Sequence, residues 1–170
     1  MKKICFFLIS FMLLSVLAGA NNILVTNASI SGQNTTNHTA LVNFSVSWEN
    51  SWRTSTNENN YDGGWIFVKF RKNGTTDWRH ATINVTGNTP ASGAVITVPA
   101  DGKGAFIYRS ANGIGNVNFA ANSIQWNYGV DGILDNETVE ILVYGLEMVY
   151  IPTGSFQLGS GGTETFGFTD

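Results

Sequence analysis

Hydrophobic and polar residues alternate along several short stretches of this chain. Within the stretch 40–48, the apolar residues Val42, Phe44, Val46 and Trp48 occupy every second position, with asparagine or serine between them. A period of two is typical of a β-strand with one buried and one exposed face. The stretch GWIFVKF, residues 64–70, is mostly β-branched or aromatic, which favours a more deeply buried strand.

Further strands are predicted at residues 23–30, 78–85, 94–98, 105–110, 116–128 and 138–151. Turn residues separate these stretches, and Asn73-Gly74 predicts a tight β-hairpin. No stretch of twelve residues among them has the 3.6-residue hydrophobic period of an amphipathic helix. The pattern therefore predicts an all-β fold, an antiparallel β-sandwich of about seven to nine strands in an immunoglobulin-like or jelly-roll-like arrangement.

The first 20 residues do not follow this alternation. Lys2 and Lys3 precede an apolar run of about 14 residues, 4–17, and Ala18-Gly19-Ala20 follows it. A charged start, a short apolar core and a small-residue cleavage site are typical of a secretory signal peptide. The run is shorter than the ~20 residues that span a bilayer. We expect cleavage after Ala20, secretion to the periplasm or the cell exterior, and no membrane segment after cleavage.

Loss of the signal peptide changes the chemistry open to the protein. It removes Cys5, the only cysteine, so residues 21–170 have no thiol for a disulfide or a metal. The loss of Lys2 and Lys3 also takes the formal charge from −3 to −5. This weak acidity and the scattered basic residues argue against a nucleic-acid partner, which needs a clustered positive surface.

Candidate catalytic and metal-binding groups are few. His38 and His80 are the only histidines, and neither has a second ligand at metal-binding spacing. The stretch DGILDNE places Asp131, Asp135 and Glu137 within one turn, where their oxygens could bind calcium. A hairpin or strand-entry turn explains the same stretch. We predict no cofactor and no metal site, with these three carboxylates as weak candidates.

The aromatic residues are the one feature with binding potential. The chain has five tryptophans and five tyrosines, and Trp52 lies among polar residues that favour its exposure. Tryptophans on a sheet face can stack on sugar rings, and they also fill the core of a sandwich that lacks disulfides. Both interpretations stay open. As a binding platform, Trp52 and Trp126 predict a glycan or another cell-surface polymer as partner.

The stretch EMVYIPTGSFQLGS resembles the opening of the formylglycine-generating enzyme family, also called the sulfatase-modifying factor family. Its members begin with a phrase of the form Met-Val-x-Ile-Pro-Gly-Gly-x-Phe-x-Met-Gly-Ser. The matching residues are Met148, Val149, Ile151, Pro152, Gly154, Phe156, Gly159 and Ser160. Thr153 replaces the first glycine of the usual pair, and Leu158 replaces a common methionine. The match covers about 14 of the 170 residues.

Much of the remaining chain is similar to the region before this family's domain in secreted proteins of Bacteroidetes-like bacteria. The stretches with this similarity lie at residues 51–83, 102–117 and 124–152. The resemblance implies a signal peptide at 1–20, a β-sandwich accessory module at 21–146, and the incomplete start of a formylglycine-generating-enzyme-like domain at 147–170.

Enzymatic members of the family oxidise a substrate cysteine to formylglycine with a pair of cysteines, copper and nearby structural calcium. Residues 21–170 contain no cysteine, so no catalytic residue transfers to this chain. We predict a secreted, non-catalytic β-sandwich module that precedes this family's domain and serves in binding or positioning. Two alternatives stay open: a fragment of a formylglycine-forming enzyme without its catalytic part, and a cell-surface glycan- or matrix-binding module.

Overall fold

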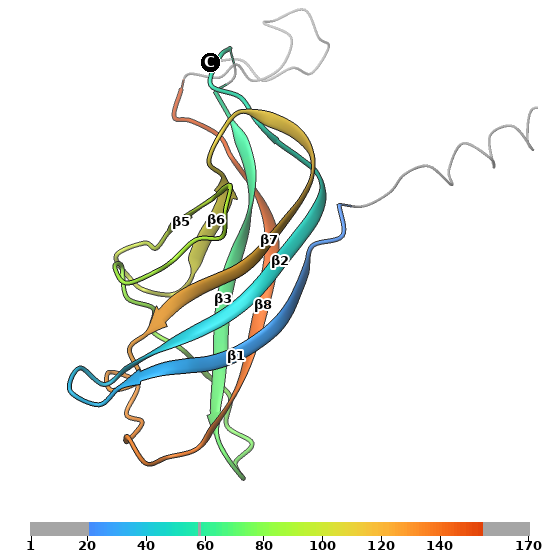
Figure 1. Ribbon diagram of the computed structural model, residues 1–170. Helices are drawn as coiled ribbons and strands as arrows, with labels where there is room; N and C mark the ends of the chain where they lie inside the picture. Colours follow the sequence, from blue (N-terminus) through green and yellow to red (C-terminus); the bar gives the residue numbers. More distant parts are fainter. Residues whose placement is uncertain (1–20, 58, 155–170) are drawn as a thin grey trace, which may run out of the picture.

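The computed structural model describes residues 21–57 and 59–154. Its strands are β1 (Leu24–Asn34), β2 (Thr39–Arg53), β3 (Tyr61–Lys72), β4 (Arg79–His80), β5 (Ala94–Thr97), β6 (Ala105–Arg109), β7 (Gly113–Trp126) and β8 (Val139–Tyr150). All strand pairs are antiparallel, and the described residues contain no helix. The predicted all-β antiparallel fold is confirmed, as a sheet curled into a half-barrel that is consistent with a β-sandwich (Figure 1).

The sheet folds over itself into two layers (Figure 1). In the first layer β2 pairs with β1 and β7. In the second layer β3 pairs with β8, β6 and β4, and β6 pairs with β5. The layers join at one corner, where Arg53 at the end of β2 pairs with Tyr61 at the start of β3. Each layer therefore has one face toward the other layer and one face outward.

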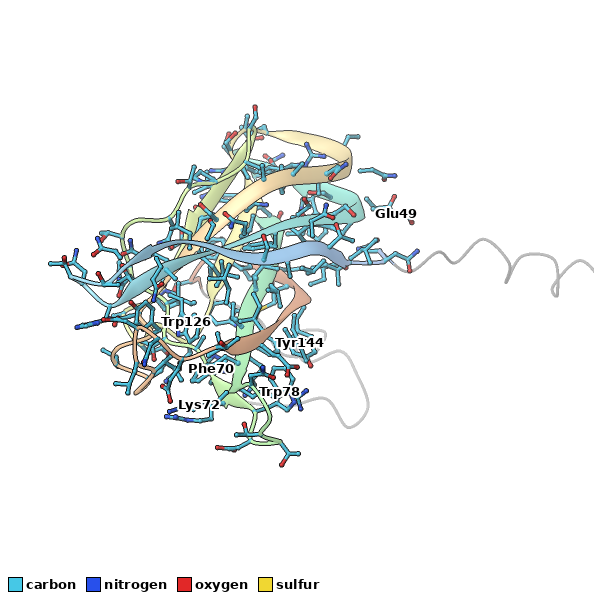
Figure 2. The ribbon with its side chains drawn as sticks, turned by 60° about the horizontal axis from the view of Figure 1, so that its bottom comes forward. Glu49, Phe70, Lys72, Trp78, Trp126 and Tyr144 are labelled. Carbon is cyan, nitrogen blue, oxygen red and sulfur yellow. The ribbon has the colours of Figure 1, made fainter. Side chains whose placement is uncertain are left out.

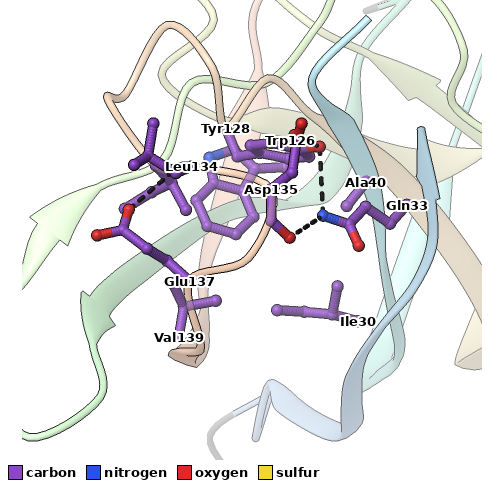
Figure 3. Close-up of a pocket in the computed structure, with 10 residues that line it drawn as sticks. Ile30, Gln33, Ala40, Trp126, Tyr128, Leu134, Asp135, Glu137 and Val139 are labelled. Atoms are coloured by element: carbon purple, nitrogen blue, oxygen red, sulfur yellow. Dashed lines mark hydrogen bonds between the residues drawn. The ribbon is translucent and has the colours of Figure 1, made fainter. Parts of the chain in front are cut away.

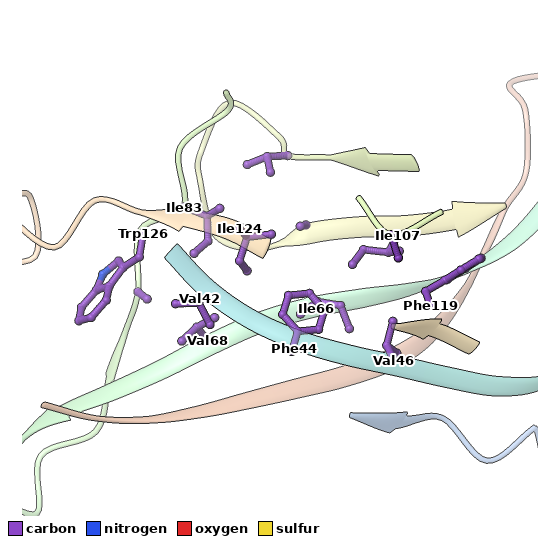
Figure 4. Close-up of a cluster of buried hydrophobic side chains, with 14 of the residues drawn as sticks. Val42, Phe44, Val46, Ile66, Val68, Ile83, Ile107, Phe119, Ile124 and Trp126 are labelled. Atoms are coloured by element: carbon purple, nitrogen blue, oxygen red, sulfur yellow. The ribbon is translucent and has the colours of Figure 1, made fainter. Parts of the chain in front are cut away.

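The core lies between the layers and is built from alternate residues of the central strands (Figure 4). The inward residues of β2 are Val42, Phe44, Val46 and Trp48, all at most 2% exposed. Ile66, Val68 and Phe70 of β3, Ile107 of β6, and Phe119, Ile124 and Trp126 of β7 are buried against them. Full burial of one large apolar side chain stabilises a fold by roughly 1.5–3 kcal/mol, so this core holds the domain without a disulfide.

The predicted strand at 78–85 is present only in part. Arg79 and His80 form β4 and pair with β3 in the second layer. Ile83 instead forms an isolated bridge with Trp126 of β7 in the first layer. The segment therefore crosses from one layer to the other, because its inward residues Ala81 and Ile83 both enter the core on the way.

β8 runs through the domain boundary that was expected between residues 146 and 147. Every residue from Val139 to Tyr150 pairs with β3, without a register shift. The first residues of the family-like phrase, 147–150, are thus the end of a strand of the sandwich. Phe156, Gly159 and Ser160 of that phrase lie outside the described residues, as does the predicted signal peptide. The described part of the chain has no helix able to span a membrane.

Candidate functional site

Trp126, one of the two predicted platform residues, lies in the core. It is 1% exposed, and its ring packs against Phe70 with 4.9 Å between ring centroids. Its Nε1–H donates a hydrogen bond to Oδ2 of Asp131 over 2.6 Å. Asp131 also accepts hydrogen bonds from the backbone N–H and the hydroxyl of Thr82, both over 2.8 Å. Trp126 thus fills the core, and Asp131 holds it there.

Asp135 and Glu137 do not converge with Asp131 on a common point. Oδ1 of Asp135 accepts a hydrogen bond from the hydroxyl of Tyr128 over 2.7 Å and lies 2.9 Å from Nδ1 of His38. Glu137 forms an ion pair with Lys72 over 2.6 Å. The described residues contain no cluster of three or more His, Cys, Asp or Glu side chains suited to a metal ion.

A small hollow of about 140 Å³ lies beside Asp135, between the end of β1 and the loop before β8 (Figure 3). Nε2 of Gln33 donates hydrogen bonds across it to the carbonyl of Asp135 and to the hydroxyl of Tyr128, over 2.9 and 3.3 Å. Hydrogen bonds from Tyr128 and His38 lower the pKa of Asp135. Burial and the bond to Asp135 raise the pKa of Tyr128. These polar groups bind one another and fasten the loop to β1.

Trp52, the other predicted platform residue, is half-buried near the end of β2. Its Nε1–H donates a hydrogen bond to Oδ1 of Asn60 over 3.2 Å. Along β2, Trp52 lies 12 residues beyond Ala40, the residue that pairs with Trp126. At about 3.3 Å per strand residue this corresponds to roughly 40 Å along β2, so the two tryptophans lie near opposite ends of the strand and do not form one platform.

An aromatic surface that sequence reasoning missed covers the outer face of β3 and β6. Trp65 and Phe106 are cross-strand partners, and each ring lies across a glycine of the other strand's segment. A Cβ added to Gly104 would lie 2.7 Å from Cζ2 of Trp65, and one added to Gly63 would lie 2.8 Å from Cζ of Phe106. Only glycine leaves room for these rings to rest on the backbone of the neighbouring strand.

Tyrosines extend this surface toward the corner of the sandwich. The ring of Tyr61 stacks on those of Tyr108 and Tyr150, with centroid distances of 4.6 and 4.7 Å. The guanidinium of Arg53 lies 5.2 Å from the centroid of Tyr61 and 5.3 Å from that of Tyr108. We call the surface formed by Tyr61, Trp65, Phe106 and Tyr108 the aromatic floor.

β8 continues the same outer face with exposed apolar side chains. We call its outward residues Leu142, Tyr144, Leu146, Met148 and Tyr150 the apolar stripe; they are 43–56% exposed. Tyr144 stacks on Phe67 of β3 with 5.2 Å between centroids, and Leu146 pairs with Trp65. In Figure 2 Tyr144 lies at the rim of the molecule, whereas Phe70 lies nearer its centre. A contiguous exposed apolar surface of this kind is typical of a binding surface.

One signal in the sequence could have located the aromatic floor. Gly63 precedes Trp65 by two residues, and Gly104 precedes Phe106 by two residues. When the aromatic residues of two Gly-x-aromatic stretches pair across antiparallel strands, each aromatic residue lies diagonally opposite the glycine of the other strand. The pairing itself joins residues about 40 positions apart, which the local pattern does not determine.

Comparison with known proteins yields no relative: no protein-family model, no curated protein and no solved structure matches this chain. Function is therefore inferred from the residues of the chain and their geometry.

Proposed function

We propose that the sandwich is a non-catalytic module of a secreted protein, which precedes and positions a sulfatase-modifying-factor-like domain. The observation that supports this most is the continuity of β8. Its last residues, Met148–Tyr150, also begin the family-like phrase, and they pair with Tyr61–Gly63 of β3. A strand that ends one domain and begins the next leaves no linker between them, so the direction of the next domain is fixed by the sheet.

The apolar stripe supplies the surface for such a contact. Leu146 is 56% exposed, Met148 is 48% exposed, and Ile151 just beyond the strand is 76% exposed. These side chains surround the point at which the family-like phrase leaves the sheet. A domain that starts there would cover them first, which would remove apolar surface from water at about 25 cal/mol per Å².

The polar groups of the described residues support binding over catalysis. Asp62 and Asp131 are buried and bonded to tryptophan side chains, and Asp135 is bonded to Tyr128 and His38. Each of these carboxylates holds two segments of the fold together. The hollow beside Asp135 is small and lined by residues that already bind one another.

The coding sequence beyond Asp170 gives the first test. An open frame that continues into a tryptophan- and glycine-rich domain supports the proposal, and a stop codon directly after Asp170 contradicts it.

The second test uses that longer gene product with Leu146→Lys and Met148→Lys together. We expect faster proteolysis near Pro152 and a larger radius of gyration by small-angle scattering, because the domain contact is lost. Leu134→Lys is the matched control, since Leu134 is 64% exposed but lies in the loop before β8, outside the apolar stripe. Identical behaviour of the double variant and the control would contradict the proposed contact.

A further inference from the structure

We infer that the aromatic floor binds a polysaccharide chain by stacking pyranose rings on Trp65 and Phe106. This site lies on β3 and β6 rather than on the apolar stripe of β8. The two surfaces adjoin, since Trp65 pairs with Leu146 and Tyr61 stacks on Tyr150, but binding at these two rings does not require the domain-positioning role proposed above.

The geometry of the two rings provides the platform. Trp65 and Phe106 rest on the backbone at Gly104 and Gly63, and both are half-buried. Both residues are partly covered by the sheet, and the part of each side chain that stays exposed is what a ligand would contact. A pyranose ring offers a face of C–H groups that packs on such an aromatic surface, while its hydroxyls point outward to polar partners.

Polar groups border the floor where sugar hydroxyls would lie. The hydroxyl of Tyr108 lies 3.5 Å from that of Thr97, at the side of the floor formed by β5. Arg53 stacks over Tyr61 and Tyr108 and donates a hydrogen bond to the carbonyl of Arg109. Its guanidinium is thus fixed in place before a ligand arrives, and a group held in its bound geometry loses little entropy on binding.

The spacing of the two rings favours a chain over a single sugar. Gly63 pairs with Tyr108, and Gly104 is the fourth residue before Tyr108 on the other strand. The two glycine positions are therefore about 13 Å apart along the strands at the usual rise per residue. Trp65 and Phe106 are themselves direct cross-strand partners, so their rings start side by side and extend in opposite directions toward these two glycines. Together they form a surface longer than one pyranose ring, so both rings engage one oligosaccharide.

The floor also differs in composition from the apolar stripe. Its members are aromatic rings bordered by hydroxyl groups and one guanidinium, whereas the apolar stripe consists mainly of aliphatic side chains. Aromatic rings bordered by polar groups suit a ligand that is apolar on its faces and polar on its edges, which describes a sugar chain.

The test is affinity electrophoresis of the whole chain, expressed with residues 1–20 in place, in gels that contain a single soluble polysaccharide. Neutral β-glucan, xylan and mannan are compared with uronate-rich alginate and polygalacturonate. We expect retardation by at least one of these, at least tenfold weaker binding for Trp65→Ala and for Phe106→Ala, and no measurable binding of the corresponding monosaccharide.

Trp78→Ala is the matched control. Trp78 is a half-buried tryptophan that packs on Arg71, with 4.8 Å from the guanidinium to the ring, outside the floor. We expect unchanged affinity for this variant and for Trp52→Ala. Tyr108→Phe keeps the ring and removes one hydroxyl, and it should weaken binding less than Phe106→Ala does. Circular dichroism melts verify that each variant is folded at the assay temperature.

Absence of retardation of the folded wild-type chain by all five polysaccharides would overturn the inference. Equal affinities of Trp65→Ala and Trp78→Ala would overturn it as well, because binding would then not involve the floor. Neither result bears on the contact at the apolar stripe, which is tested by Leu146→Lys and Met148→Lys.

Discussion

Two kinds of tryptophan occur in this sandwich, and their surroundings differ. Trp48 and Trp126 are at most 2% exposed, and each donates its Nε1–H to a buried carboxylate, Asp62 over 2.5 Å and Asp131 over 2.6 Å. Trp65 is half-buried on the outer face and rests on the backbone at a glycine. The first two rings are enclosed by the fold, whereas the third keeps one side toward the outside.

The two carboxylates bind their tryptophans in the same way. Asp62 accepts hydrogen bonds from the indole of Trp48, the hydroxyl of Ser51 and the backbone N–H of Trp52. Asp131 likewise accepts bonds from an indole, a hydroxyl and a backbone N–H. Within the described residues no buried side-chain nitrogen or oxygen lacks a partner. A tryptophan fixed in this manner stabilises the fold, and one that lies across a glycine is available to a ligand.

Removal of a buried carboxylate should have the largest effect on stability. Asp62→Ala leaves three donors without an acceptor in a fully buried site, and each stranded group costs about 1–3 kcal/mol. We expect the free energy of unfolding to fall by about 3 kcal/mol or more, measured by urea denaturation. Asp131 is 8% exposed, so in Asp131→Ala water partly satisfies the donors that the carboxylate leaves behind. This substitution should therefore lower the free energy of unfolding by less than Asp62→Ala does. A loss equal to that of the exposed Asp77→Ala would contradict this role.

Replacement of the indoles by phenyl rings separates the two kinds of tryptophan directly. Trp126→Phe loses a hydrogen bond to a charged group, worth about 1.5–3 kcal/mol, and also leaves a cavity in the core. Trp65→Phe loses neither, because Trp65 packs on the backbone of the outer face. We therefore expect the midpoint of thermal unfolding to fall clearly for Trp126→Phe and little for Trp65→Phe. Equal shifts would show that both rings serve the core.

A methyl group at Gly104 should disturb the aromatic floor. The added Cβ would lie 2.7 Å from the carbonyl oxygen of Ile66 and 2.7 Å from Cζ2 of Trp65, so the ring and the strand must shift. We expect Gly104→Ala to lower the free energy of unfolding by about 1–3 kcal/mol, as overpacking does, and to change the fluorescence of the folded protein. At Gly113 the nearest atom would be 3.5 Å away, which makes Gly113→Ala the control. Equal stabilities of the two variants would contradict the packing described for Trp65.

The sequence pattern locates the core better than it locates the candidate site. The alternation in residues 40–48 fixes which side chains of β2 face inward, because a strand has a period of two and one buried face. The composition of the stretch 64–70 favours a more deeply buried strand, yet Trp65 and Phe67 face outward and are only half-buried. Which side of β3 faces outward follows from the curl of the sheet, and neither residue type nor local pattern specifies it.

The candidate platform was misplaced for a related reason. Polar neighbours in sequence marked Trp52 as exposed, whereas its burial depends on Asn60 and on the corner between β2 and β3. For Trp126 the sequence left both a core role and a platform role open, and its carboxylate partner, Asp131, belongs to a stretch that also resembles a metal-binding turn. In both cases the burial of the tryptophan depends on how the sheet folds, which the local pattern of residues does not specify.

The smallest effect on stability is expected at Asp135, the exposed carboxylate in the loop before β8. Hydrogen bonds from Tyr128 and His38 lower the pKa of Asp135 below its ordinary value of 3.8. A carboxyl group with a lowered pKa in the folded state stabilises the protein above its unfolded pKa, and this contribution is lost as the pH falls through the folded pKa. The wild-type melting temperature should therefore fall slightly more than that of Asp135→Asn between neutral pH and about pH 3.

Asp77→Asn serves as the control for this comparison, since Asp77 is exposed in the turn after β3 and should leave the acid-induced decrease unchanged. If Asp135→Asn retains the full wild-type pH dependence, the bonds to Tyr128 and His38 do not contribute to folding. A decrease as large as the loss expected for Asp131→Ala would instead place Asp135 with the buried carboxylates. The distinction between buried and exposed carboxylates would then not hold for this loop. Loss of the bond from Trp48 to Asp62, or from Trp126 to Asp131, is costly because each acceptor is buried.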